Sequence, residues 1–136
     1  MIRYLLDTNI VIYVIKRRPP EVLQIFNQHT GSMAISSITL AELCHGAEKS
    51  TRMADNLRVI DDFTSRLEVL PYTAKAAQHY GSIRAALEAQ GQTIGINDLH
   101  NAAHARSEGL VLVTNNLREF ERVPALQTEN WIEPPR

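Results

Sequence analysis

The sequence lacks most of the features that mark membrane, secreted or disulfide-rich proteins. Its single cysteine, Cys44, excludes an intrachain disulfide and a four-cysteine zinc site. No apolar run approaches the ~20 residues that span a bilayer. The start of the chain carries Asp7 and has no small-residue cleavage site, so it makes a poor signal peptide. We therefore expect a protein of the reducing cytoplasm that has no membrane partner.

Two nucleotide- and nucleic-acid-binding signals are also missing. There is no G-x-x-x-x-G-K motif, which excludes a P-loop nucleotide hydrolase. The net charge is only −1, so the overall field does not indicate nucleic acid binding. The eleven arginines against three lysines weakly favour phosphate recognition, because the guanidinium group binds phosphate in a bidentate manner. Ordinary surface salt bridges explain the same bias equally well.

Length and patterning indicate one α/β domain over residues 1–136. Strand-like runs alternate with helical patterns. The predicted strands are Ile2–Leu6, Met33–Ser36, Glu68–Leu70, Leu110–Thr114 and an edge strand at Leu126–Thr128. The predicted helices are Ile10–Ile15, Pro20–His29, Ile38–Glu48, Thr51–Arg66, a long helix capped by Thr73 and running to Gln90, Asp98–Glu108, and a turn or short helix at Asn115–Phe120. This alternation predicts a doubly wound, open parallel sheet of about four to five short strands with helices on both faces.

Four acidic residues fall at element ends that such a sheet brings together. Asp7 and Glu119 follow the predicted central strands, and Glu42 and Asp98 lie in the first turns of helices. Taken singly, each has an ordinary explanation, because acids cap helices, favour helix N-termini or sit on the surface. Together they fall at the carboxyl edge of the sheet, where ligands of this fold class bind.

A carboxylate cluster needs protons or a cation. At about 5 Å and an effective dielectric constant of about 20, each pair of charges costs roughly 3 kcal/mol. Oxygen-only ligands favour Mg²⁺, with Mn²⁺ as a substitute, over zinc. Thr8, Asn9, Thr114 and Asn116 add neutral polar groups beside the acids, where they could orient carboxylates or simply form turns.

Four segments resemble a known family. LLDTN, ITLAEL, NDLHNAAHA and VTNNLREFERVPAL occur in the order found in PIN-domain ribonucleases of the VapC toxin type, from residue 1 to about Trp131. The resemblance implies a PIN-like fold and a Mg²⁺ site formed by Asp7, Glu42 and Asp98. Where many PIN domains have a further Asp, this chain has Asn116. The resemblance implies that Glu119, one turn later, serves as the fourth acid instead, and whether Asn116 or Glu119 completes the site stays open at this point.

The resemblance also implies a biological role. VapC-type toxins belong to type II toxin–antitoxin systems and cleave structured RNA. Those most similar to this chain are associated with initiator tRNA, cut in its anticodon loop, which inhibits translation. A VapB-type antitoxin inserts its C-terminal segment into the active-site groove, and only through it does the toxin meet operator DNA. Homodimers are usual in the family.

The basic residues that we expect to hold RNA are Lys16, Arg17, Arg18, Arg84, Arg118 and Arg122, of which about half should make contact. Hydrolysis by water predicts products with 5′-phosphate and 3′-hydroxyl ends. His100 and His104 have the i, i+4 spacing of a helical zinc site, but Asn101 stands where a zinc protease has Glu, which favours a structural role.

Two alternatives remain open at this point. An aspartyl-phosphate phosphatase also begins with a strand and an Asp, but it needs a second Asp where this chain has Asn9, and no lysine follows Lys75. A catalytically weak PIN module that only binds RNA or protein is favoured by Asn116.

Overall fold

In the computed structural model, which describes residues 1–132, five short parallel strands form one sheet. The strands are β1 (Tyr4–Leu6), β2 (Met33–Ser36), β3 (Glu68–Leu70), β4 (Val111–Val113) and β5 (Thr128–Glu129). Their order is β3-β2-β1-β4-β5, so the chain winds outward from β1 in both directions. The strand order reverses between β1 and β4, and the crevice beyond the carboxyl ends of these strands is where such sheets bind ligands.

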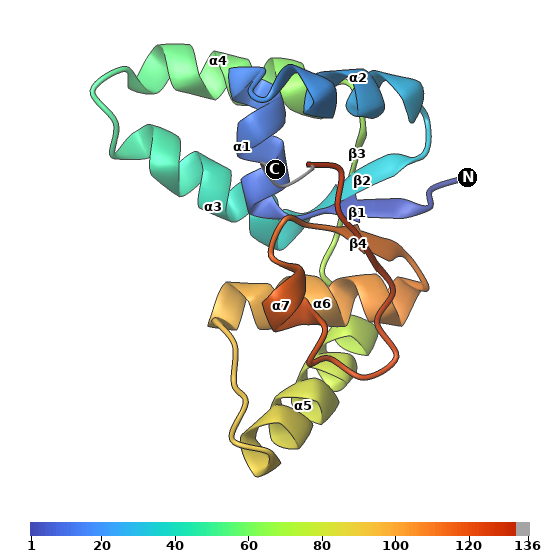
Figure 1. Ribbon diagram of the computed structural model, residues 1–136. Helices are drawn as coiled ribbons and strands as arrows, with labels where there is room; N and C mark the ends of the chain where they lie inside the picture. Colours follow the sequence, from blue (N-terminus) through green and yellow to red (C-terminus); the bar gives the residue numbers. More distant parts are fainter. Residues whose placement is uncertain (133–136) are drawn as a thin grey trace.

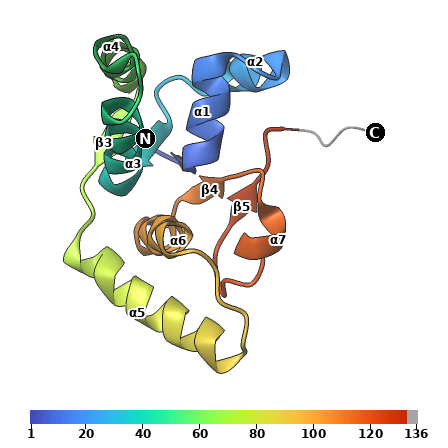
Figure 2. The ribbon, with the colours of Figure 1, turned by 90° about the vertical axis from the view of Figure 1, so that its left-hand side faces the viewer.

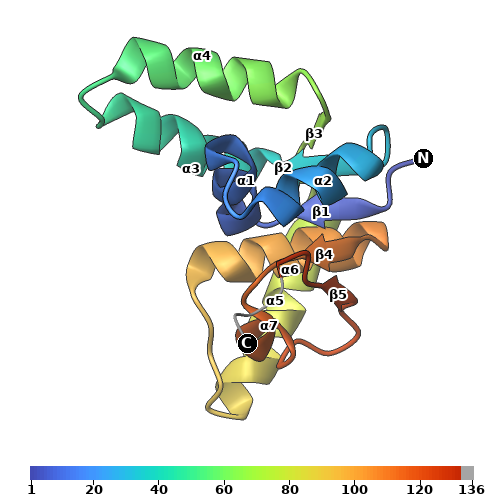
Figure 3. The ribbon, with the colours of Figure 1, turned by 45° about the horizontal axis from the view of Figure 1, so that its top comes forward.

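Helices cover both faces of the sheet. They are α1 (Thr8–Lys16), α2 (Pro20–Gln28), α3 (Ser37–Glu48), α4 (Met53–Thr64), α5 (Ala74–Ala89), α6 (Ile96–Glu108) and α7 (Leu117–Phe120). Helices α1 to α4 lie on one side and α5 to α7 on the other (Figures 1 and 2). Helices α3 and α4 run side by side and extend beyond the sheet, as Figure 3 shows.

The central strands β1 and β4 divide their side chains between two cores, which is why they are apolar throughout, whereas the edge strands β3 and β5 carry Glu68 and Glu129. Tyr4 and Leu6 of β1 pack with Ile35 of β2 into the core under α1 to α4. Leu5 and Leu112 point the other way, into the core under α5 to α7. Successive residues of a strand face opposite sides of a sheet, so a strand covered on both faces is expected to be apolar at successive positions.

The predicted architecture is confirmed, but several boundaries are wrong by a few residues. The edge strand is Thr128–Glu129 and not Leu126–Thr128, and the fourth helix is shorter at both ends than Thr51–Arg66. From Trp131 onward the sequence predicts a loose tail in which only Trp131 is anchored. Trp131 is buried against Tyr4 and His29, and Ile132 packs against the core under α1 to α4. Residues 133–136 lie outside the described part of the chain.

Three helices begin earlier than predicted: α1 at Thr8, α3 at Ser37 and α6 at Ile96. For α3 the shift changes the helical turn in which its acid lies. Ser36, not Ser37, caps α3 by accepting a hydrogen bond from the Ile38 amide at 3.1 Å. Glu42 therefore lies in the second helical turn and not in the first. Helix α6 begins after Gly95, so Asn97 is not its cap, and Asp98 remains in its first turn. Among residues 1–132, no helix combines the length and apolarity needed to cross a bilayer.

Candidate active site

Asp7 stands at the centre of the site, directly after β1 and at the start of α1. Its side chain is buried, with an exposed fraction of 3%. One carboxylate oxygen, Oδ1, accepts hydrogen bonds from the Thr8 amide at 2.8 Å and from Asn101 Nδ2 at 3.4 Å. The other, Oδ2, accepts a hydrogen bond from the Thr114 hydroxyl at 3.0 Å. Burial raises the pKa of Asp7, the hydrogen bonds from Thr114 and from the Thr8 amide lower it, and the nearby charges of Glu42 and Glu119 raise it again.

A polar network connects Asp7 to the acid on α3. Thr39 is fully buried and donates a hydrogen bond to Asn101 Oδ1 at 3.2 Å. The Thr8 hydroxyl lies 3.2 Å from Thr39 Oγ1 and 2.9 Å from Glu42 Oε1. It has one proton, and the charged, nearer carboxylate is the stronger acceptor. The network thus fixes Glu42 relative to Asp7.

Asp98 and Glu119 complete the acidic group from the other side. Asp98 is half-buried near the start of α6, and Gly95 lets its carboxylate fold back close to the backbone, because a Cβ atom at Gly95 would lie 3.3 Å from Asp98 Oδ2. Desolvation, the charge of Asp7 and a hydrogen bond with Glu119 together raise the pKa of Asp98 to about 7. A carboxyl group in this state is poised to lose its proton when a cation binds nearby.

Three of the four predicted acids line one open hollow of about 570 Å³. Asp7, Glu42 and Asp98 form its polar end, and Ile12 and Val59 are among its apolar walls. Glu119 does not line this hollow but is close enough to raise the pKa values of Asp7 and Asp98. Within residues 1–132, no three His, Cys, Asp or Glu side chains already stand as the ligands of one metal ion. The acids are neighbours whose carboxylates repel one another.

The neutral residues predicted to support the acids differ in their roles. Thr8 and Thr114 bind the carboxylates directly, as described above. Asn116 donates its backbone amide to Thr114 Oγ1 at 3.0 Å, which orients the threonine hydroxyl toward Asp7. Asn9 is exposed and lines the hollow.

The basic residues predicted to hold RNA are dispersed. Lys16 lines the acidic hollow, and Arg17 lines the neighbouring groove. Arg84 lies on α5, where it donates to the Tyr80 hydroxyl at 2.8 Å and pairs with Glu88. Arg122 donates to the carbonyl oxygen of Thr93 at 3.2 Å. Arg18 and Arg118 are exposed.

A second groove, of about 710 Å³, adjoins the acidic hollow and shares Ile15 and Val59 with it. It lies between α1, α2 and α4, with Phe26 and Phe63 in its floor and charged side chains at its rim. The rim residues are Arg17, Asp55, Arg58, Asp62 and Arg66.

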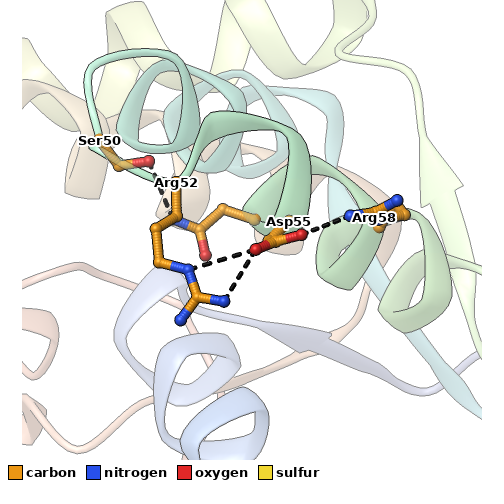
Figure 4. A network of polar contacts seen from close by, with 5 residues as sticks. Ser50, Arg52, Asp55 and Arg58 are labelled. Atoms are coloured by element: carbon orange, nitrogen blue, oxygen red, sulfur yellow. Dashed lines mark hydrogen bonds and ion pairs between the residues drawn. The ribbon is translucent and has the colours of Figure 1, made fainter.

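The arginines on and beside α4 are partly neutralised by acids of that helix. Asp55 is held between Arg52, at 2.8 Å, and Arg58, as Figure 4 shows. Arg66 pairs with Asp62 at 3.2 Å. These pairs are exposed and contribute little to stability. They balance charge around an apolar groove and do not create a strongly basic surface.

The two histidines of α6 make contacts within the protein, which agrees with the structural role that the sequence favoured over a zinc site. His104 is buried and its Nδ1 lies 2.7 Å from Ser36 Oγ, so it joins α6 to the end of β2. Burial lowers its pKa, which keeps the ring neutral. His100 Nδ1 lies 2.8 Å from the Tyr72 hydroxyl, and its ring stacks on Tyr80 at 4.4 Å.

Sequence reasoning missed two residues of the site, Asn101 and Thr39. Each lies three residues from a predicted acid on the same helix, Asn101 from Asp98 and Thr39 from Glu42. That spacing places side chains on the same face of a helix. A buried polar residue at i±3 from a candidate ligand was the signal that could have found them.

Comparisons with known proteins match this arrangement to one family along nearly the whole chain. Residues 4–126 match the PIN domain model. Ribonuclease VapC2 of Haemophilus influenzae is 64% identical over 97% of this chain and 100% of that protein. The tRNA(fMet)-specific endonuclease VapC of Shigella flexneri is 54% identical over 96% of this chain and 99% of that protein. The crystal structure of DNA-bound VapBC from Salmonella typhimurium contains a chain that is 52% identical, with a TM-score of 0.93 over 97% of this chain and 100% of that one.

Proposed function

This chain belongs to the PIN-domain family and to its VapC ribonucleases, and from that premise we propose that it is the toxin of a type II toxin–antitoxin system that hydrolyses RNA phosphodiester bonds with Mg²⁺. The observation that carries the proposal is the convergence of Asp7, Glu42, Asp98 and Glu119 at the switch point of the sheet. Desolvation by burial, followed by the charge of Asp7 and the contact with Glu119, raises the pKa of Asp98 to about 7. Burying like charges together in this way serves cation binding better than it serves folding.

The residues fit a hard divalent cation. Every candidate ligand is a carboxylate oxygen, which Mg²⁺ and Mn²⁺ prefer. Asp7, Glu42 and Asp98 would hold the ion, with Glu119 beside Asp98, and Glu42 and Glu119 have the side-chain rotations needed to approach it. When bound, the cation polarises a phosphoryl oxygen and makes water a better nucleophile.

The chain's own residues prepare the site for in-line attack by water. Thr8, Thr114 and Asn101 fix the Asp7 carboxylate before any substrate arrives. Asp98 exchanges its proton near neutral pH, so it can become charged when RNA and cation enter. Lys16 at the wall of the hollow is suited to bind a backbone phosphate. Since water attacks, the products carry 5′-phosphate and 3′-hydroxyl ends, and no histidine is required.

We propose initiator tRNA, cut in the anticodon loop, as the substrate whose loss stops translation. The support is the name of the Shigella flexneri relative, a tRNA(fMet)-specific endonuclease, together with 54% identity to it. The RNA-binding side chains should come from Lys16, Arg17, Arg18, Arg84, Arg118 and Arg122. Arg17 and Lys16 are the nearest to the hollow, whereas Arg84 and Arg122 are engaged in contacts within the protein.

We further propose that a VapB-type antitoxin covers the groove between α1, α2 and α4. An apolar floor leading directly into an acidic hollow fits a helix with apolar side chains that ends in a basic residue. Operator DNA would be contacted through the antitoxin, in line with the net charge of −1. Val59→Asp, at the junction of the groove and the hollow, should weaken antitoxin binding. Met53→Asp is the matched control, because Met53 lies on the same helix, is equally exposed at 43% and is not in the groove lining.

The substrate assignment is tested with purified, antitoxin-free protein and two transcripts, initiator tRNA and elongator methionine tRNA. Cleavage of the initiator tRNA alone, in the anticodon loop and with 5′-phosphate products, is the expected result. Equal cleavage of both transcripts would refute the substrate assignment. If added VapB-type antitoxin did not inhibit cleavage, the proposed partner would be refuted. Light scattering on the same preparation tests the expected homodimer.

A further inference from the structure

Asn101 lies at the centre of the polar network and touches both the catalytic aspartate and α3. It is 1% exposed and sits one turn after Asp98 on α6. Its Nδ2 donates to Asp7 Oδ1 at 3.4 Å, and its Oδ1 accepts from the Thr39 hydroxyl at 3.2 Å. The amide orientation is determined by these partners, because the opposite orientation would direct the amide oxygen at the Asp7 carboxylate.

The hydrogen bonds to Asp7 leave one acceptor position of its carboxylate free. An ionised carboxylate has about four acceptor positions, two on each oxygen. On Oδ1, the Thr8 amide and Asn101 take both positions. On Oδ2, the Thr114 hydroxyl takes one, which leaves a single open position on that oxygen. Because Asp7 lines the acidic hollow, this open position on Oδ2 is the one available to a cation there.

We propose that Asn101 is a positioning residue that restricts Asp7 to one available oxygen and thereby favours a small cation that takes a single carboxylate oxygen from each ligand. The inference rests on the proposed function, since it concerns the cation of that site. Mg²⁺ accepts one oxygen per carboxylate, whereas Ca²⁺ readily takes both oxygens of one carboxylate. Occupying Oδ1 from within the protein thus discriminates against Ca²⁺.

Thr39 extends the same control to the acid on α3. Its one hydroxyl proton goes to the Asn101 amide oxygen, so toward Thr8 it can only accept. Because the Thr8 proton is directed mainly at Glu42, the 3.2 Å approach of the two hydroxyls is the weaker contact. The Thr8 hydroxyl also lies 2.9 Å from Glu42. Asn101 and Thr39 therefore lie between the Asp7 carboxylate and the Thr8 hydroxyl that holds Glu42, as outer-shell residues do in metal sites.

Asn101→Leu tests the proposal, because leucine has a similar volume but cannot form either hydrogen bond. Isothermal titration calorimetry of Mg²⁺ and of Ca²⁺ with the full-length protein gives the two dissociation constants without reference to activity. We expect the affinity for Mg²⁺ to fall about tenfold, as is typical when an outer-shell partner is lost, and that for Ca²⁺ to stay constant or rise. Thr39→Val should shift the ratio in the same direction, and Thr39→Ser should restore the ratio of the wild type.

The control is Ser107→Ala, which removes another buried polar group of α6. Within residues 1–132 the Ser107 hydroxyl bonds only to the His104 carbonyl oxygen, at 2.8 Å. It should keep the Mg²⁺ to Ca²⁺ ratio of the wild type. If Asn101→Leu and Thr39→Val change both dissociation constants by the same factor, or leave both unchanged, the inference is overturned. If Asn101→Leu does not fold, the comparison of Thr39→Val with Thr39→Ser tests the inference in its place. If the wild-type protein binds neither ion, the proposed metal site itself has failed, which is a different result.

Discussion

Removing the charge of Asp98 should stabilise the protein at alkaline pH while destroying its response to Mg²⁺. The pKa of this carboxyl group is about 7 in the folded chain, against an ordinary value of 3.8. A shift of about three units corresponds to about 4 kcal/mol at 1.36 kcal/mol per unit. Because Asp98 is half-exposed, solvent screening reduces the penalty to about 1–2 kcal/mol.

The sign of the pH dependence follows from the direction of the shift. Since the folded pKa is the higher one, the folded state holds more protons than the unfolded state between about pH 4 and pH 7, and stability falls as pH rises through this window. Above pH 7 the full penalty acts on the wild-type protein. Asp98→Asn removes it, so the variant should melt about 3–7 °C higher at pH 8, using ~2.1 cal/mol/K per residue for the unfolding entropy. At pH 5 the rise in melting temperature should be about a third of that at pH 8.

Differential scanning calorimetry at pH 8 and pH 5 measures both the change in melting temperature and the response to Mg²⁺. Each scan is made with EDTA or with about 10 mM Mg²⁺, which suffices for a weak site. In the wild type, Mg²⁺ should raise the melting temperature, and in Asp98→Asn it should raise it much less. The control Asp61→Asn removes an exposed charge on α4, outside the hollow. A lower melting temperature for Asp98→Asn at pH 8, or an equal gain at both pH values, would show that the carboxylates do not repel one another as described.

Three further changes test the parts of the site separately. Thr114→Val removes the hydrogen bond to Asp7 Oδ2 and should cost about 1–2 kcal/mol in unfolding free energy, by urea denaturation, with about tenfold weaker Mg²⁺ binding; unchanged Mg²⁺ binding would contradict this role. Gly95→Ala places a Cβ atom 3.3 Å from Asp98 Oδ2, so cleavage should fall several-fold while the circular dichroism spectrum is retained, because the backbone at Gly95 is extended (ψ 151°) and suits alanine. Glu119→Gln removes one cause of the raised pKa of Asp98, so the acid limb of the pH–rate profile should move to lower pH, and an unmoved limb would exclude Glu119 from the site.

The sequence was sufficient to predict those parts of the site that are tied to element ends. Asp7 follows a strand buried on both faces and Asp98 opens a helix, so a parallel sheet had to bring both to its carboxyl edge. Glu42 was also predicted from its place near a helix start, but it lies in the second turn of α3 and not in the first, because the cap is Ser36 and not Ser37.

What the sequence did not predict depends on the relative orientation of helices. Asn101 lies within the run NDLHNAAHA, where small residues around it indicate only a buried helix. That its amide meets Thr39, 62 residues away in the chain, follows from how α6 packs against α3. The apolar groove likewise depends on α4 lying across from α1 and α2, which no local pattern encodes.

The most direct test of the account is cleavage of total bacterial RNA by the purified, antitoxin-free protein, with Mg²⁺ or with EDTA, beside the Asp7→Asn variant. Asparagine keeps the size of the side chain but removes the central charge of the site. The account predicts discrete RNA fragments that require both Mg²⁺ and Asp7. Equal cleavage by a folded Asp7→Asn variant, or cleavage that persists in EDTA, would contradict it.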